Sequence, residues 1–338
     1  MDLNKIFLKD ACPTAVGGQA VMEGIMMRGA ERSAVAVRIP DGRIHMKTYP
    51  NKKLGKWAKV PLIRGVVSFV TSLVQGTGTL MYSADVLEEY WPEDENVEPD
   101  KLEAWLNEKF GKKGAWNVMI YLSVIFAICF SVGLFILLPT VVVNWADGFI
   151  QSAIMLNLLE GILRLLLFGI YVVLINKMED IKRVFQYHGA EHKTIHCFEK
   201  NLELTPENAQ QFYTLHPRCG TSFLVFVMVI SLILFSLLGW PNLFWRITSR
   251  LLLLPVVAGL SYEVLKWAGR SDNWMVKMLS IPGLYMQKLT TNEPDESQLE
   301  IAICAMKAVM VSPDTPYFEG ICDLEGKLIE EHKIERGN

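Results

Sequence analysis

Several features are missing from this sequence, and each absence excludes a class of protein or site. Its six cysteines are few and scattered, so a disulfide scaffold is excluded. The formal net charge of -3 gives no electrostatic reason to expect nucleic acid as a partner. No glycine-rich phosphate loop of the Walker or Rossmann form occurs. Residues 1–18 contain no apolar core of signal-peptide length, so we expect no cleaved export signal.

Charge is also scarce, because charged residues make up 20% of the chain and hydrophobic residues 51%. Ordinary soluble domains carry about 25% charge, so the deficit predicts long stretches free of charge. A membrane span needs roughly 20 mostly apolar residues. Four stretches meet this requirement or come near it, at residues 118–143, 152–175, 222–240 and 251–267. We therefore expect about four transmembrane helices.

A fifth apolar stretch, residues 60–84, is diluted by Arg64, Gln75 and three glycines. We interpret it as an amphipathic or re-entrant helix that does not span the membrane. The many lysines and arginines of residues 1–59 support this interpretation, since the positive-inside rule keeps that segment in the cytoplasm. Four spans then return the C-terminus to the same side, so both termini are expected in the cytoplasm.

Two charged side chains fall inside an expected span. Glu160 and Arg164 are four residues apart, which is the favourable order for an ion pair on one helix face. Charges inside a membrane are costly unless they are paired or functional. Mutual neutralisation is therefore the simpler interpretation, and an ion pathway is the alternative.

The predicted fold class is mainly α, a polytopic helical membrane protein with a small cytoplasmic α+β portion. Asp41-Gly42, flanked by alternating apolar and polar residues, predicts a β-hairpin. In the C-terminal part, Pro282-Gly283 predicts an interruption of regular structure, and residues 296–311 predict an amphipathic helix. The charged tail from Cys322 is expected to be loosely held.

The chain is thereby divided into four segments. Residues 1–59 carry a glycine-rich motif and the hairpin, and residues 60–117 contain the amphipathic helix and an acidic connector. Residues 118–267 form the transmembrane bundle, which includes a cytoplasmic connection at 176–221. Residues 268–338 are a cytoplasmic C-terminal segment.

Three of the six histidines fall within nine residues of the 176–221 connection. On a helix, His188, His192 and His196 form a single row. Neighbours one turn apart can share a metal ion, but His188 and His196 are separated by roughly 12 Å along the axis, at 1.5 Å per residue. One of the three histidines therefore needs another role.

Residues 188–192 also form the pattern His-x-x-Glu-His, in which two histidines hold zinc and the glutamate is the general base. A bound metal lowers the pKa of water toward neutrality, and a carboxylate within hydrogen-bond reach then takes the proton. Glu191 is thus the candidate catalytic residue, with His188 and His192 as ligands of zinc or another divalent ion. The alternative is a polar helix along the membrane surface.

A zinc site needs further protein ligands, and His216 and Cys219 are spaced like a ligand pair. If both joined His188 and His192, the shell would be closed and the metal structural.

The glycine-rich segment 17–24 offers a different completion of the site. Glu23 could supply a ligand there and leave one coordination position open for water. Alternatively, Glu23 is a turn residue paired with Arg28. The residues alone do not decide between these possibilities.

Several motifs in a fixed order resemble the YqhQ-like family of bacterial membrane proteins. They are GGQAVMEG at 17–24, MMRG at 26–29, HGAEHK at 188–193, HPRCGT at 216–221, and QKLTT at 287–291 before Glu293-Pro294. The match covers nearly the whole chain. The resemblance implies a multi-pass protein of the bacterial plasma membrane and a predicted metal-dependent enzyme of unknown function.

Two hypotheses follow. The first is a metal-dependent hydrolase at the cytoplasmic membrane surface that acts on a membrane-associated peptide or lipid. The second is a non-enzymatic membrane scaffold or transport component with a structural metal site. The lipid bilayer is a partner in both.

Overall fold

The computed structural model describes residues 6–8, 12, 14, 16–51, 55, 60–90, 101–239, 242–268 and 273–332. The chain separates into two compact units. The first comprises Met1–Trp91, Tyr171–Ile230 and Leu254–Asn338, and the second comprises Pro92–Ile170 and Ser231–Leu253.

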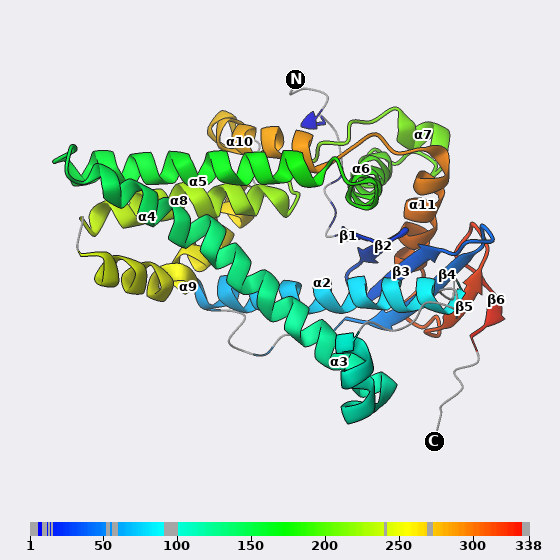
Figure 1. Cartoon of the computed structure of the whole chain (residues 1–338). Helices are drawn as coiled ribbons and strands as arrows, with labels where there is room; N and C mark the ends of the chain where they lie inside the picture. The colour runs from blue at the N-terminus through cyan, green and yellow to red at the C-terminus, as the bar shows by residue number, and fades with distance from the viewer. Residues whose placement is uncertain are drawn as a thin grey trace. The chain divides into compact units, whose positions relative to one another are not determined.

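The first unit contains a six-stranded antiparallel sheet whose strands lie side by side in chain order. The strands are β1 (Gly17–Val21), β2 (Gly24–Arg28), β3 (Arg32–Arg38), β4 (Ile44–Pro50), β5 (Glu319–Cys322) and β6 (Leu328–Glu331), as Figure 1 shows. The predicted hairpin is β3–β4, and Gly42 in its loop has a φ of 87°, which favours glycine. A two-stranded hairpin is only marginally stable, so the other strands supply the pairing it needs.

Two segments of this sheet depart from the sequence-based expectations. The glycine-rich motif at 17–24 forms β1 and the start of β2. The segment from Cys322 is not loosely held over its described part, because β5 pairs with β4 and β6 pairs with β5. Strands 270 residues apart can pair in this way because side chains on both faces of the sheet are buried by helices.

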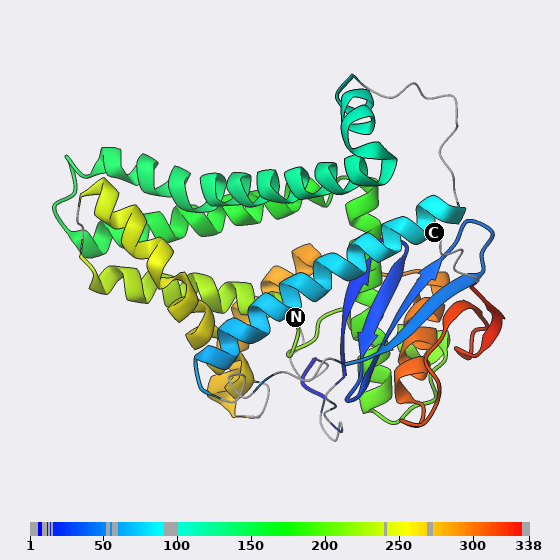
Figure 2. The same ribbon diagram turned by 90° about the horizontal axis from the view of Figure 1, so that it is seen from below.

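Helices cover both faces of the sheet. On one face lie α6 (Glu179–Glu199), α7 (Pro206–Gln210) and α11 (Glu296–Met310), packed around Ala34 and Ala36 of β3. On the other lies α2 (Ile63–Tyr90), packed around Val35 and Val37 through its C-terminal half. The alternation follows from the period of two along a strand. Figure 2 shows α2 (cyan) and α11 (orange) on opposite sides of the sheet.

The predicted amphipathic helices form. α2 covers the stretch 60–84 from Ile63 and continues to Tyr90. α11 begins after Asp295, whose side chain accepts from the Gln298 N–H in a capping box. The acidic connector is only partly described, because residues 91–100 lie outside the described residues.

The predicted break at Pro282-Gly283 is wrong. α10 (Trp274–Thr290) continues through both residues. A Cβ at Gly283 would lie 2.6 Å from Ser222 Oγ, so the glycine permits a close approach to the neighbouring chain. This packing outweighs the low helix propensity of the pair.

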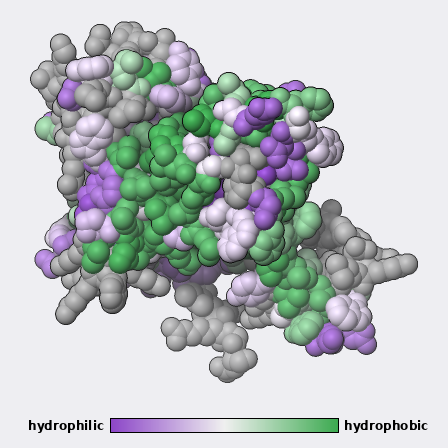
Figure 3. Space-filling model, turned by 90° about the vertical axis from the view of Figure 1, so that its left-hand side faces the viewer, coloured by the Kyte–Doolittle hydropathy of each residue, from purple (hydrophilic) through white to green (hydrophobic). Residues whose placement is uncertain are grey.

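Three helical stretches among the described residues are long and apolar enough to cross a membrane: Tyr121–Ala146, Ala153–Ile175 and Leu243–Trp267. A fourth apolar helix, Thr221–Leu237, has 17 residues. All four apolar helices overlap the stretches that the sequence predicts, and three of them reach the length of a span. Figure 3 shows that apolar side chains gather in one broad expanse on the face it presents.

These stretches belong to several helical elements, which are α3 (Lys101–Val132), η2 (Gly133–Leu137), α4 (Leu138–Ala146), α5 (Ala153–Ile175), α8 (Thr221–Leu237) and α9 (Leu243–Ala268). α9 begins at Leu243, earlier than the predicted start of its span at residue 251. The helix therefore includes Arg246 and Arg250, which lie before the predicted span.

Candidate metal centre

The histidine row lies on α6, as predicted. The helix begins after Met178 with Glu179 and Asp180 in its first turn, where negative charge is favourable. Its second half is buried between the sheet and the chain leading into α8. Because that chain carries His216 and Cys219, it brings two further predicted ligands to the helix.

One candidate ligand group consists of His188, His192 and Cys219. A nitrogen or sulfur atom from each residue lies within 4.8 Å of the other two. His188 Nε2 and Cys219 Sγ lie 3.3 Å apart. We call these three residues the first group.

The hydrogen bonds of the two histidines leave one nitrogen of each free for a metal. His188 Nδ1 donates to the Thr290 carbonyl at 2.8 Å, and His192 Nδ1 donates to the Thr214 carbonyl. A histidine that donates from Nδ1 keeps a lone pair on Nε2, the usual arrangement at metal sites. Among the described residues, His192 Nε2 is buried without a hydrogen-bond partner. A buried nitrogen with a free lone pair and no hydrogen-bond partner is suited to bind a metal.

Cys219 is suited to act as a thiolate ligand. Burial raises the pKa of its thiol, whereas His192 and the hydroxyl and N–H of Thr221 lower it, and the net direction is downward. The Thr221 N–H lies 3.3 Å from Sγ. Thiolate and imidazole ligands together are typical of zinc sites.

Glu191 lies beside the first group without belonging to it. Burial raises the pKa of its carboxyl to about 7, against the opposing effects of His188 and of the Gly18 N–H that donates to it. The contact with β1 is tight, since a Cβ at Gly18 would lie 2.8 Å from Glu191 Cδ. A carboxylate adjacent to the ligands, with a pKa near neutrality, is in the position expected of a general base.

The remaining histidines of the region form a second group with a residue that the sequence analysis missed. His196, Glu199 and His216 also place ligand atoms within 4.8 Å of one another. His216, expected beside Cys219 as a fourth ligand, thus lies with Glu199 instead. The spacing held a signal for Glu199, because it follows His196 by three residues on a helix and so shares its face.

The carboxylate of this second group, unlike the ligands of the first, already has a positively charged partner. Glu199 forms an ion pair with Arg218 and accepts from the Thr14 N–H at 2.9 Å. Burial raises the pKa of Glu199, but His216, Thr14 and Arg218 lower it to about 2. His216 Nδ1 accepts from the Arg218 N–H at 3.3 Å. Its Nε2 lies 3.7 Å from Glu199 Oε2, beyond hydrogen-bond distance, and has no hydrogen-bond partner among the described residues.

The C-terminal QKLTT motif holds the loop that carries these residues. Gln287 Oε1 accepts from the His216 N–H at 2.8 Å, and Gln287 Nε2 donates to the His216 carbonyl at 2.9 Å. Thr290 supplies the carbonyl that orients His188. Gly189 allows this approach, since a Cβ there would lie 2.1 Å from the Asn292 carbonyl oxygen. The sequence alone predicts no role for this motif.

Glu23 and Arg28 are outside both groups. Glu23 is a turn residue between β1 and β2 with a φ of 47°. This agrees with the alternative in which Glu23 is a turn residue rather than a metal ligand. Its partner is Arg183 rather than Arg28, so the predicted pairing is wrong. Arg28 instead donates to Gln75 Oε1 at 3.2 Å. The partners of Glu23 and Arg28 differ from the predicted ones because they lie on helices α6 and α2, and the local sequence does not predict that these helices flank β1 and β2.

The predicted ion pair of Glu160 and Arg164 is present in the second unit, at 3.0 Å. Arg250 also pairs with Glu160, and Thr140 Oγ1 donates to it at 2.9 Å. The pairing with Arg250 was missed because α9 was expected to begin after it.

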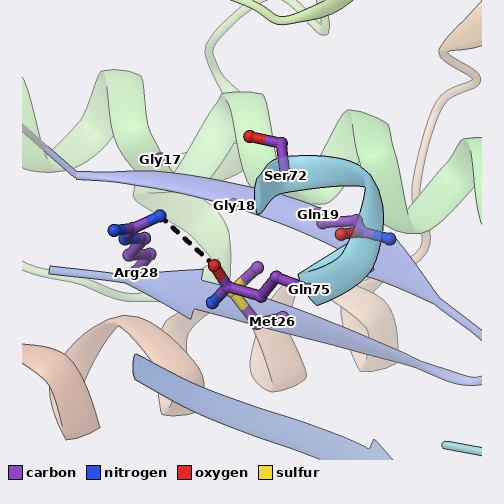
Figure 4. A pocket seen from close by; sticks show the side chains of 7 residues that line it. All are labelled: Gly17, Gly18, Gln19, Met26, Arg28, Ser72 and Gln75. Atoms are coloured by element: carbon purple, nitrogen blue, oxygen red, sulfur yellow. Dashed lines mark hydrogen bonds between the residues drawn. The ribbon is translucent and has the colours of Figure 1, made fainter. Parts of the chain in front are cut away.

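A cavity of about 370 Å³ lies on the α2 side of β1 and β2. Its lining, drawn in Figure 4, consists of Gly17, Gly18, Gln19, Met26, Arg28, Ser72 and Gln75. Gly18 contacts Glu191 as well, so a single glycine of β1 borders both the cavity and the candidate base.

Comparison with known proteins identifies the family. A family described as "Protein of unknown function (DUF1385)" matches residues 60–312. "Uncharacterized protein YqhQ" of Bacillus subtilis (strain 168) is 35% identical over 303 residues, which cover 87% of this chain and 92% of that protein. No solved structure matches the chain. The chain therefore belongs to the DUF1385 family, whose function is unknown.

Proposed function

We propose that the chain is a metal-dependent hydrolase that holds zinc, or another divalent ion, through His188, His192 and Cys219. The observation that carries the proposal is the convergence of their three ligand atoms within 4.8 Å. Three protein ligands with a free fourth position are typical of catalytic zinc, whereas structural zinc sites have four. His216, the residue that could close the shell, belongs to the second group, and its Nδ1 accepts from the Arg218 N–H.

The residues around the ion would divide the work of hydrolysis. When bound, a divalent ion supplies Lewis acidity, which lowers the pKa of water and polarises a scissile carbonyl. Glu191 would accept the proton of the attacking water on its carboxylate. The Gly18 N–H and the close packing against β1 hold that carboxylate in place. Thr290 and Thr214 orient the two imidazoles through their carbonyls.

We further propose that the protein resides in the bacterial plasma membrane with both termini and the site on the cytoplasmic side. The three long apolar helices and the basic N-terminal segment support this placement. Cys219 lies two residues before α8, so a site there is close to the membrane surface. The substrate class that follows is a membrane-associated peptide or lipid.

A scaffold or transport component is the second candidate function. It is favoured by the charged cluster of Glu160, Arg164 and Arg250, which lies within stretches apolar enough to span a membrane. Buried charges at such positions commonly mark ion or substrate pathways.

Cobalt substitution of the purified full-length protein tests the hydrolase proposal. A thiolate-to-cobalt absorption band that is lost in Cys219→Ser and kept in Cys197→Ser would identify the ligand. Acetohydroxamate, a chelating probe, should change the cobalt spectrum if a coordination position is open. A cobalt spectrum that does not respond to the probe would indicate a closed structural site and contradict the proposal.

A further inference from the structure

We propose that the α2 side of β1 and β2 forms a binding site for an anionic lipid, with a phosphate-type head group at Arg28 and hydrocarbon against α2. This inference rests on the proposed function only in taking the bound lipid to be the substrate. The binding site itself is argued from residues that hold no metal.

Two cavities meet at Arg28 and Gln75. The first is the cavity of about 370 Å³ that Gly18 borders. The second, of about 440 Å³, is lined by Arg28, Tyr49, Pro50, Asn51, Val70, Thr71, Val74, Gln75, Gly78 and Thr79. Each lies in the size range of small-molecule pockets. Because both share the Arg28–Gln75 pair, one ligand can extend along the second cavity and place its head group at Arg28, where the first cavity begins.

The charge of the site favours an anion. Among the described residues, Arg28 is the sole charged side chain that lines either cavity, and no carboxylate lines them. Its recorded partner is the neutral Gln75, to whose Oε1 it donates at 3.2 Å, as the dashed line in Figure 4 shows. A guanidinium has five N–H donors in a fork that matches phosphate oxygens. An anionic head group would supply the negative charge that the surroundings lack.

The second cavity continues into an apolar surface. Val70 and Val74, which line it, are 50% and 68% exposed, and Phe69 and Leu73 of the same helix are also exposed. Their spacing of three and four residues places them along one side of α2. A contiguous apolar surface of this kind marks contact with protein or lipid.

The neighbours of α2 favour lipid over a peptide as the occupant. The Phe69 ring lies 5.6 Å from the ring of Phe223 on the apolar helix α8. Gly65 packs against Gly259 of α9, within a stretch long and apolar enough to span a membrane. The exposed apolar side of α2 therefore lies at the depth of helices that require hydrocarbon around them.

The position of the head group links this site to Glu191. Gly18 lines the first cavity, and a Cβ on it would lie 2.8 Å from Glu191 Cδ. Gly18 therefore borders the head-group cavity and also packs against the proposed base on the α6 side of β1. The substrate class assigned to the site is thus an anionic amphiphile that enters along α2 with its head group toward β1.

Calorimetric titration of the full-length Glu191→Gln protein in phosphatidylcholine nanodiscs tests the proposal without turnover. The probes are dihexanoyl phosphatidic acid, dihexanoyl phosphatidylcholine, inorganic phosphate, and an apolar hexapeptide with a free C-terminal carboxylate. We expect phosphatidic acid to bind at least tenfold more tightly than the other three, since a hydrogen-bonded charge contributes a factor of about 10 to 100.

Two variants with matched controls locate the binding site. Arg28→Gln should weaken phosphatidic acid binding at least tenfold, whereas Arg43→Gln, on an exposed loop, should not. Gly78→Leu should fill the second cavity, which Gly78 lines, and so abolish binding. The fold should be left intact, because a Cβ at Gly78 has nothing within 4 Å. The control Gly169→Leu also has open space but lies outside the cavities.

Several results would overturn the proposal. Equal affinity for inorganic phosphate would indicate a plain anion site, equal affinity for phosphatidylcholine an unselective apolar pocket, and tighter binding of the peptide a peptide site. Unchanged binding in Arg28→Gln would also overturn it. Metal content, measured on the same samples, separates the two proposals: lipid binding without metal refutes the hydrolase alone, and metal without lipid binding refutes this inference alone.

Discussion

Replacing Gly18 by alanine perturbs Glu191 without touching a metal ligand. The added Cβ would lie 2.8 Å from Glu191 Cδ, 3.0 Å from its Cγ and 2.8 Å from the Met26 carbonyl oxygen. Ordinary contacts between carbon atoms are about 3.5 Å or longer. A shift of the Glu191 side chain relieves the two contacts with Glu191 but not the contact with Met26, so the backbone of β1 and β2 has to adjust as well.

The displacement sets the size of the effect. Restoring a contact of about 3.5 Å requires a shift of roughly 0.7 Å at Glu191. A misplacement of about 1 Å in a catalytic group costs about 100-fold in rate, and loss of a general base costs about 10²- to 10⁴-fold. We therefore expect hydrolysis to fall about 100-fold. Overpacking of this kind also destabilises a protein by about 1–3 kcal/mol.

The assay combines hydrolysis of p-nitrophenyl acetate by the zinc-loaded protein with elemental analysis and thermal unfolding. Gly17→Ala is the matched control, because a Cβ at Gly17 has nothing within 4 Å. It should leave hydrolysis, metal content and unfolding temperature unchanged. The reasoning is refuted if Gly18→Ala hydrolyses the ester at the wild-type rate, or if it loses the metal together with activity.

Three further predictions concern the stability of the fold. Glu160→Gln leaves two buried arginines without their carboxylate and should lower the free energy of unfolding by about 3–5 kcal/mol; an unchanged denaturation midpoint would contradict the network. Burial and the nearby His332 lower the pKa of His45 from 6.5 to about 4, so stability is complete above pH 6.5 and falls as the pH drops toward 4. His45→Phe should flatten that decline in denaturation curves recorded between pH 7.5 and 4.5, and an equally steep decline in the variant would show that another group is responsible. Asp295→Ala removes the cap of α11 and should cost about 1 kcal/mol, whereas Ser297→Ala should not; equal losses would exclude the capping box.

Local signals in the sequence predicted local structure correctly. The Asp41-Gly42 hairpin, the α11 helix and the histidine row on α6 each depend on residues within about one or two turns of one another. The Glu160–Arg164 pair likewise joins successive turns of one helix. In each case the periodicity of the element brings the side chains together.

Features that depend on distant segments could not be predicted in this way. β5 joins β4 from the far end of the chain, and no local pattern identifies that partner. His216 and Cys219 belong to different groups although they are three residues apart in the sequence. Their loop is held by Gln287, which is 71 residues from His216. The pairing of Arg250 with Glu160 joins two helices that are 90 residues apart in the sequence, so no local pattern predicts it. Pro282 continues a helix because tertiary packing outweighs its propensity.

Elemental analysis of the purified full-length protein beside His192→Ala and His216→Ala decides whether the first group holds a metal. We predict one zinc or other divalent ion per chain, lost in His192→Ala and kept in His216→Ala, since only His192 belongs to the first group. Loss of the ion in both variants would instead indicate a closed shell with a structural metal. A wild-type protein that binds no ion after reconstitution would contradict the metal centre altogether.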